Sequence, residues 1–446
     1  MKIIIAGAGE VGFHVAQMLS SEEHDIVLID KDSERLNQAE SQIDIGVMKG
    51  NAVSISVLEK SGINGADLLI AATSVEDTNL TTAILGKKLG AKRTIARISN
   101  PEFQRENGRL DMRELGIDAM VFPEELAAKE IYRLIKLSAA TDSFVFGEGK
   151  LYLTGLVLDQ EAPLVNKSLI EAVQLMPDVH FTVVAIQRGE KTIVPRGDTR
   201  FRPNDHVYFI SKPDCVHQIT RLSGKAGIEV NNLMILGGSL IARIFAKNLG
   251  KKYNIKLIEK DREKCFELAS ELTDVMVLHG DGSNVALLED EGIENMDAFV
   301  ALTGDSETNI ISCLVAKSRG VKRTIALVEN MAYISLSQSI GIDTLINKKM
   351  IAINNIFRYV RAGNVEALTS LHGVESEVLE FVVNEHCKIT EAPIKKLKFP
   401  REAVIAGIIR GEESFTASGE THIQAGDRVV VFTLPSAISK VESYFQ

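Results

Sequence analysis

An internal duplication constrains the fold of this chain more than any other feature of its sequence. The pentamer KRTIA that begins at Lys92 recurs unchanged at Lys322, an offset of 230 residues. The offset shrinks to 222 further along, where Arg188-Gly-Glu matches Arg410-Gly-Glu. Matches that stay in order while the loops between them shorten are poorly explained by convergence. The chain is therefore expected to be a tandem repeat of one folding unit.

Each half of the repeat contains two kinds of sequence pattern. Up to residue 138, short apolar runs alternate with helix-length amphipathic stretches, which is typical of βαβ units around a parallel sheet. From about residue 140 to 222, short runs separated by turn residues surround one helix near Ser168–Leu175. The sequence predicts an α/β fold with two tandem Rossmann-like, doubly wound parallel-sheet domains, each followed by a small α+β C-terminal lobe. The strands of the first sheet are expected at Lys2–Ala6, Ile26–Ile29, Gly46–Lys49, Leu68–Ala72 and Thr94–Ile98.

The repeat also predicts the domain boundaries. The expected domains are a first Rossmann-like lobe at 1–138, its C-lobe at 139–222, a second Rossmann-like lobe at 232–366 and its C-lobe at 373–446, with a linker at 223–227. Two closing helices, Glu124–Leu137 and Met350–Arg361, carry apolar residues at i, i+3, i+4 and i+7. Each apolar stripe fits either packing on its own sheet or a shared dimer seam.

Charge and composition exclude several classes of protein. With 50 basic and 60 acidic side chains the formal charge is −10, which argues against nucleic acid as the main partner. The four cysteines lie far apart without a CxxC pair, so we expect reduced thiols and no zinc site or other metal site. The first residues lack a signal-peptide pattern, and no apolar run approaches the roughly 18–20 residues that span a bilayer. We therefore expect a cytoplasmic protein.

A glycine-rich loop follows the first expected strand and leads into a helix that begins near Val11. In this context GxGxxG predicts a dinucleotide-binding turn. The first glycine permits the turn, the second admits a pyrophosphate, and the third lets the helix pack on the strand. The helix N-terminus then offers free N–H groups to phosphates. The expected cofactor-binding residues of this loop are Gly7, Ala8, Gly9, Glu10, Val11 and Gly12.

An acidic residue ends the second expected strand. Asp30 lies 23 residues after Gly7, where a carboxylate accepts hydrogen bonds from a ribose and repels a 2′-phosphate. This favours NAD(H) or ATP/ADP over NADP(H); the alternative role of a helix cap could be filled by Asp32 or Ser33. The neighbouring strand ends supply an amide for an adenine edge and an arginine as a phosphate clamp or a surface salt bridge. These further expected site residues are Asn51, Ala52, Thr73, Ser74 and Arg97.

The second half keeps this scaffold but changes its chemistry. Its loop has Ser239 at the second glycine position and Ala242 at the third, and Leu327 replaces the arginine. A side chain at position 239 obstructs the approach of a pyrophosphate. We expect weaker or different nucleotide binding here, or a purely structural domain. The residues expected at the ribose, adenine and strand-end positions are Glu259, Asp281 and Thr303.

Together these motifs resemble the TrkA family, the regulatory subunits of bacterial Trk potassium-uptake systems, which carry two RCK (KTN) units in one chain. The resemblance covers the whole chain and includes Asp77-x-Asn79-Leu80, although Asn51 stands where the family turn usually has Asp. It implies a non-enzymatic protein that binds NAD(H) or ATP/ADP. It also implies a homo-oligomeric, tetrameric ring on the inner face of the membrane, which gates an integral-membrane, TrkH/TrkG-like potassium-translocating subunit.

Two other functions compete with this interpretation. An NAD-dependent oxidoreductase requires a proton donor beside the cofactor and a substrate domain. The nine histidines pair with no carboxylate at a recognisable spacing, and Tyr132 and Tyr333 lack a lysine four residues on. A pure interaction scaffold is opposed by the intact first glycine loop and by Asp30.

Overall fold

The computed structural model describes residues 1–20, 24–104, 111–137, 140–189, 191–224, 229–330, 333, 341–360, 365–370 and 376–446. Its contacts divide the chain into two units. Met1–Ala127 with Lys348–Arg361 form the first unit, and Ala128–Asn347 with Ala362–Gln446 form the second. The expected linker at 223–227 lies outside the described residues from position 225 on.

The first unit is built around a six-stranded parallel sheet of order β3-β2-β1-β4-β5-β6. This order places β1 beside β4 at the point where the chain reverses direction across the sheet, which is where such folds bind ligands. Its strands are β1 Lys2–Ala6, β2 Asp25–Asp30, β3 Gly46–Lys49, β4 Leu68–Ala71, β5 Arg93–Arg97 and β6 Ala119–Val121. Its helices are α1 Glu10–Ser20, α2 Ser33–Gln42, α3 Ile55–Lys60, α4 Glu76–Lys88 and the start of α5 Pro123–Lys136.

The second parallel sheet repeats this arrangement in the order β14-β13-β12-β15-β16-β17. Its strands are β12 Asn232–Leu236, β13 Asn254–Glu259, β14 Val275–His279, β15 Ala298–Ala301, β16 Arg323–Leu327 and β17 Thr344–Ile346. The associated helices are α8 Leu240–Leu249, α9 Arg262–Glu271, α10 Val285–Asp290 and α11 Ser306–Ser318. The predicted pair of Rossmann-like sheets is confirmed.

Two small antiparallel sheets follow the parallel ones. Their orders, β10-β9-β11-β8-β7 and β18-β19-β22-β20-β21, are the same when the strands are matched along the chain. The strands are β7 Asp142–Phe146, β8 Leu151–Val157, β9 Phe181–Arg188, β10 Lys191–Ile193, β11 His206–Ser211, β18 Val365–Ser370, β19 Glu377–Val382, β20 Ala403–Arg410, β21 Glu413–Thr416 and β22 Arg428–Thr433. The helices are α6 Leu169–Leu175, α7 Val216–Thr220 and α14 Ile438–Glu442.

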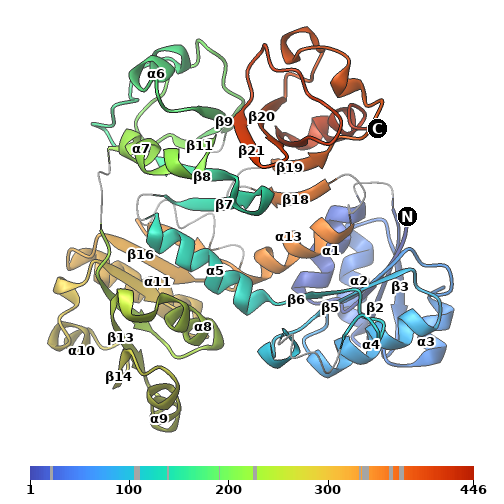
Figure 1. Ribbon diagram of the computed structural model, residues 1–446. Helices are drawn as coiled ribbons and strands as arrows, with labels where there is room; N and C mark the ends of the chain where they lie inside the picture. Colours follow the sequence, from blue (N-terminus) through green and yellow to red (C-terminus); the bar gives the residue numbers. More distant parts are fainter. Residues whose placement is uncertain are drawn as a thin grey trace. The chain divides into compact units, whose positions relative to one another are not determined.

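The two small lobes lie side by side and share one apolar core (Figure 1). Phe146 and Tyr208 of the first lobe pack in it with Val430 and Phe432 of the second. The lobes differ in one helix. In the first, α6 begins with a capping box between Ser168 and Glu171, whereas only 3₁₀ turns occupy the shorter connection between β19 and β20.

The helix that closes the second repeat packs on the first parallel-sheet domain. Helix α13, Lys348–Val360, contacts α1 and β6 within the first unit, and Figure 1 shows α13 beside α1. The Arg93 guanidinium donates to the Tyr359 carbonyl at 2.9 Å. Helix α13 therefore packs on the first repeat and not on the sheet of its own repeat. The apolar stripe predicts a face to bury but does not specify the partner that buries it.

The arginines of the repeated pentamer make comparable contacts in the two units. In the second unit, Arg323 is 2% exposed and donates to the Ala140 carbonyl at 2.6 Å and to Thr344 Oγ1 at 3.0 Å. Burial lowers the pKa of the Arg323 guanidinium, and the charge of Asp343 acts against that effect. Each repeated arginine thus fixes backbone that comes from the other repeat.

The repeated acidic residues are also explained by local bonding. The Arg188 guanidinium donates two hydrogen bonds of 2.7 Å to the carboxylate of Asp205. The Arg410 guanidinium donates two to the carboxylate of Asp427, at 2.8 and 2.7 Å. Both carboxylates are almost fully buried. Two hydrogen bonds from a positively charged guanidinium offset the free-energy cost of burying each carboxylate. The same bonds fix the β-turn that precedes the last strand of each small lobe.

Two further observations bear on the class of the protein. None of the helices in the described part of the chain combines the length and the apolar character that a bilayer span requires. All four cysteines are buried free thiols, and burial raises the pKa of Cys215, Cys265 and Cys313.

Arg323→Met is expected to lower the free energy of unfolding by about 2–4 kcal/mol, because it leaves the Ala140 carbonyl unpaired in a buried site. The matched variant Arg93→Met should lose only about 1 kcal/mol, since Arg93 is partly exposed and water can replace the bond. Urea denaturation followed by circular dichroism measures both. Equal losses for the two variants would contradict this account.

Candidate nucleotide-binding site

The three glycines of the first loop have different physical constraints. Gly7 has φ +109°, and a Cβ there would lie 2.9 Å from the backbone of Thr73. A Cβ on Gly12 would lie 1.8 Å from the Gly7 carbonyl oxygen. At Gly9 the nearest neighbour of a Cβ would be an Arg35 nitrogen at 3.7 Å. Only Gly9 therefore faces open space, as the turn requires if a ligand is to approach its backbone.

The carboxylate of Asp30 anchors this loop to the sheet. Its Oδ2 accepts from the Ala8 N–H at 2.6 Å, and its Oδ1 accepts from the Asp32 N–H at 2.9 Å. The cap of α2 is Asp32, which accepts from the N–H groups of Glu34 and Arg35. Asp30 is therefore not the helix cap, and it lies beside the glycine loop.

The expected first-half residues surround one cleft of about 650 Å³ at the carboxyl edge of the first sheet, with the exception of Gly12. Gly12 lies behind the loop, where its missing side chain lets α1 approach Gly7. The cleft is lined by Gly7, Ala8, Gly9, Glu10, Val11, Asp30, Asn51, Ala52, Thr73, Ser74 and Arg97. Its volume suits a nucleotide-sized ligand.

The sequence interpretation missed several lining residues, among them the cations Lys31, Arg35 and Lys349. Lys31 and Arg35 follow Asp30 by one and five residues. Their closeness to the end of β2 could therefore have been inferred from the sequence. Lys349 had no such signal, because it comes from α13, 339 residues after its ion-pair partner Glu10.

A buried asparagine holds two neighbouring strand ends at the cleft. Asn79 Nδ2 donates to the carbonyls of Thr73 and Arg97, and its Oδ1 accepts from Thr73 N and Oγ1. The Arg97 guanidinium has no ion-pair partner among the residues that the structure describes, which leaves its charge to the cleft. Asn51 Oδ1 accepts from the Val53 N–H at 3.3 Å, so the Asn51 side chain stabilises the turn that follows β3.

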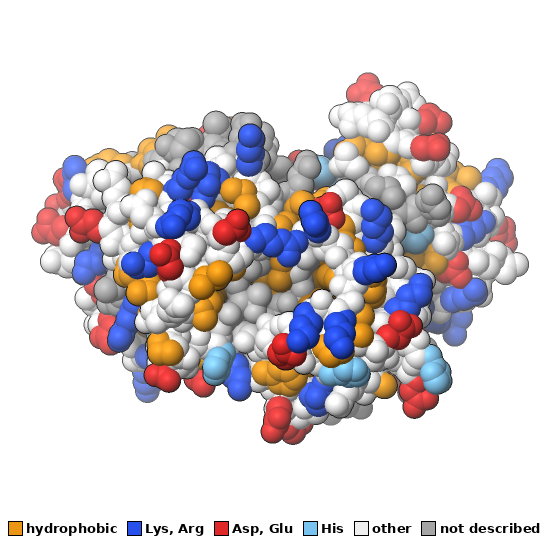
Figure 2. All heavy atoms as spheres, turned by 90° about the horizontal axis from the view of Figure 1, so that it is seen from above, with side chains coloured by type: hydrophobic (Ala, Val, Ile, Leu, Met, Phe, Trp, Pro, Cys, Tyr) orange, Lys and Arg blue, Asp and Glu red, His pale blue; other side chains and the backbone are white. Residues whose placement is uncertain are grey.

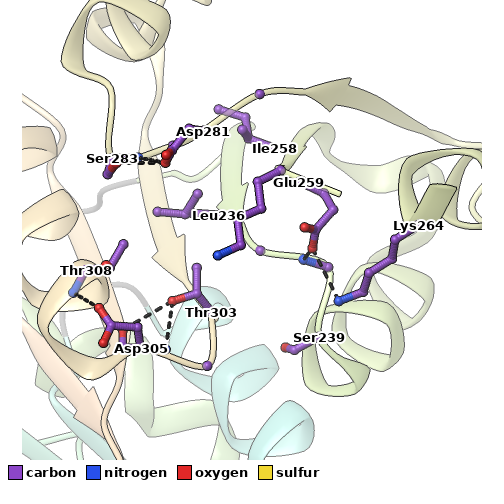
Figure 3. Close-up of a pocket in the computed structure, with 16 residues that line it drawn as sticks. Leu236, Ser239, Ile258, Glu259, Lys264, Asp281, Ser283, Thr303, Asp305 and Thr308 are labelled. Carbon is purple, nitrogen blue, oxygen red and sulfur yellow. Dashed lines mark hydrogen bonds and ion pairs between the residues drawn. The ribbon is translucent and has the colours of Figure 1, made fainter. Parts of the chain in front are cut away.

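The second half forms an equivalent cleft of about 330 Å³ (Figure 3). Its Glu259 accepts from Gly238 N at 2.7 Å and from Asp261 N at 2.9 Å, in the same pattern as Asp30. A Cβ on Gly238 would lie 2.4 Å from Leu268 Cδ1 and 3.0 Å from Glu259 Oε2, so both side chains crowd the position that Ala8 occupies in the first loop.

Other side chains of the second cleft are also committed to local bonds. Ser239 is the N-cap of α8, where its Oγ accepts from the Ala242 N–H. Asp281 Oδ1 accepts from the backbone N–H and the hydroxyl of Ser283 (Figure 3). Lys264 Nζ lies 3.3 Å from Glu259 Oε2. Asn309 ties Thr303 to the end of β16 as Asn79 does in the first half.

The acids of the second cleft are stabilised in their charged form. Burial raises the pKa of Glu259, but hydrogen bonds from Asp261 and Gly238 and the charge of Lys264 outweigh burial and lower it below its usual value. Hydrogen bonds from Ser283 lower the pKa of Asp281, and those from Thr308 lower the pKa of Asp305. These carboxylates are therefore ionised at neutral pH.

The charge balance distinguishes the two clefts. The cations Lys31, Arg35, Arg97 and Lys349 line the first against the acids Glu10 and Asp30, whereas Lys260 and Lys264 line the second against Glu259, Asp281 and Asp305. The first cleft thus has an excess of two cations and the second an excess of one acid. On the face drawn in Figure 2, basic and acidic side chains are intermixed.

Comparison with known proteins gives consistent matches. Residues 3–123 and 233–348 match the TrkA-N domain, and residues 153–224 and 378–446 match the TrkA-C domain. The chain is 33% identical to the Trk system potassium uptake protein TrkA homolog 1 of Methanosarcina mazei over the full length of both. It is 31% identical to the TrkA of Azorhizobium caulinodans, covering 100% of this chain and 99% of that protein.

Solved structures agree in fold. The GsuK RCK domain superposes with a TM-score of 0.62 at 16% identity, covering 100% of this chain and 94% of that one. A GsuK channel bound to NAD gives the same TM-score and identity, with 78% of its chain covered. With both domain types matched twice and relatives matched along their whole length, the chain belongs to the TrkA family of Trk system potassium uptake proteins.

Proposed function

We propose that this chain is a non-enzymatic regulatory subunit of a potassium-uptake system, and that NAD(H) or ATP/ADP binds as a signal in the first cleft. The observation that carries the proposal is the single cleft beside the intact glycine loop, lined by an excess of cations. Relatives named as Trk system potassium uptake proteins support the role in potassium transport, and a GsuK channel bound to NAD and another bound to ADP support the ligand class.

Different residues of the first cleft bind different parts of the nucleotide. The N–H groups at the start of α1 and the Arg97 guanidinium hold phosphates, because both present positive charge or donors to the same space. Asp30, fixed by its two backbone donors, accepts from ribose hydroxyls. Asn51 presents an amide to the adenine edge.

Regulation then follows from differential affinity. The subunit assembles as a homo-oligomeric, tetrameric ring at the inner face of the membrane and docks on an integral-membrane potassium-translocating subunit of the TrkH/TrkG type. A nucleotide can shift this ring between two shapes only by the ratio of its affinities for them. The chain itself then needs no catalytic residue.

Arg97→Leu, which copies Leu327 of the second repeat, is expected to weaken NADH and ADP binding about tenfold or more through loss of a charge-assisted hydrogen bond. Isothermal titration calorimetry on the full chain measures the affinities. Thermal unfolding should stay at the wild-type temperature, since the described residues give Arg97 no ion-pair partner to lose. Glu259→Ala is the matched control and should leave the tight site intact.

Titration of wild-type protein with NADH is expected to give one tight site per chain, because the second cleft is smaller and has an excess of acid. In Asp30→Ala the tight site should disappear, since the ribose acceptor and the loop anchor are lost together. Two equal tight sites per chain would contradict the assignment of tight binding to the first cleft. Tight binding that survives in Asp30→Ala and vanishes in Glu259→Ala would place the tight site in the second cleft instead.

Potassium flux into vesicles that contain the membrane subunit and the full chain tests the regulatory role. NADH or ATP should change the flux with wild-type chain and not with Arg97→Leu at the same concentration. NADH absorbance should remain constant throughout, because the ligand is a signal; steady consumption of NADH would favour an oxidoreductase instead.

A further inference from the structure

The first cleft contains an ion pair that its glycine motif does not explain. Glu10 is the first residue of α1 and lies inside the motif, where its carboxylate adds negative charge next to the phosphate-binding N–H groups. Lys349 Nζ lies 2.7 Å from Glu10 Oε2, and both residues line the cleft. An acid at this place opposes phosphate binding unless its charge is balanced.

The lysine is the more enclosed partner of this pair. Its side chain is 19% exposed, against 54% for Glu10. Solvent therefore screens the Lys349 charge less than it screens a typical surface lysine. The packing of α13 on α1 holds Lys349 in this position.

The pair belongs to the first cleft alone when the two repeats are aligned. Leu240 occupies the position of Glu10 in the second loop, at the offset of 230. At the offset of 225 that applies to the closing helices, Lys349 corresponds to Glu124 in α5. The second repeat thus supplies a cation where the first repeat has an acid.

We propose that Lys349 is the residue that lets the first cleft accept a strongly charged polyphosphate, and that Glu10 and Lys349 together set its discrimination between nucleotides by phosphate charge. This rests on the nucleotide binding proposed above. Lys349 cancels the Glu10 charge, so the loop N–H groups and Arg97 attract terminal phosphate oxygens without opposition from the acid. Since α13 follows β17 of the second repeat along the chain, phosphate charge at the first loop acts directly on a helix of the other repeat.

Opposite effects of two substitutions distinguish this role from a merely structural ion pair. Lys349→Met leaves Glu10 uncompensated and should weaken ATP binding about ten- to a hundredfold, ADP less, and NADH about threefold or less, because the unbalanced acid repels ATP most. Glu10→Gln removes the repulsion and should strengthen ATP binding several-fold. A pair that only docks α13 predicts that both variants weaken all three ligands alike.

Calorimetry on the full chain at low and raised salt provides the affinities. Lys348→Met is the matched control, because Lys348 neighbours Lys349 on α13 but pairs with Glu124 at 3.9 Å and does not line the cleft. Lys349→Arg should restore the preference for ATP, which shows that charge and not helix packing is responsible. Thermal unfolding of each variant checks that α13 remains docked.

The outcomes separate the two proposals. If wild-type protein binds no nucleotide, the proposed function fails. If wild-type protein binds ATP and NADH but Lys349→Met weakens them equally, or Glu10→Gln weakens ATP, the inference about Lys349 is wrong while the nucleotide site stands.

Discussion

The carboxylate at the end of the second strand of each parallel sheet is the interaction on which both clefts depend. In one half Asp30, and in the other Glu259, accepts a backbone N–H from the glycine loop and another from the start of the next helix. These two hydrogen bonds fix the glycine loop at the edge of each cleft. The same atoms that stabilise the loop are those proposed to recognise a ribose, which explains how binding and loop geometry are coupled.

The two clefts show how a duplicated scaffold changes chemistry at constant backbone. Leu268 and Glu259 leave little room for a side chain at position 238, where the first loop has Ala8. Ser239 became a helix cap, and Leu327 replaced an arginine. None of these changes disturbs the strand order, since the buried asparagines Asn79 and Asn309 make the same four hydrogen bonds in both halves. The charge balance of the cleft therefore differs between the two repeats, while the strand order of the sheet stays the same.

The sequence predicted five of the six strands of the first sheet and the glycine loop, because these depend on local patterns, but it did not predict the three-residue strand β6. β1 and β3 have the expected bounds, and the apolar runs that mark β2, β4 and β5 are displaced by one residue at most. The partner of α13 could not be predicted, because an amphipathic stripe specifies a face to bury and not the surface that buries it. Lys349 was missed for that reason. The helix α7 was not predicted, because an element of five residues in a small lobe carries little periodicity of its own.

The position of α13 has a consequence for how the chain acquires its structure. As synthesis proceeds from the N-terminus, the first parallel sheet can form early, but the surface of α1 stays uncovered until residue 348 and beyond have left the ribosome. Contacts between residues so far apart close late and slowly. The face of α1 that α13 covers is therefore exposed for most of synthesis, so truncation or a pause before α13 creates a species prone to aggregation or to capture by a chaperone.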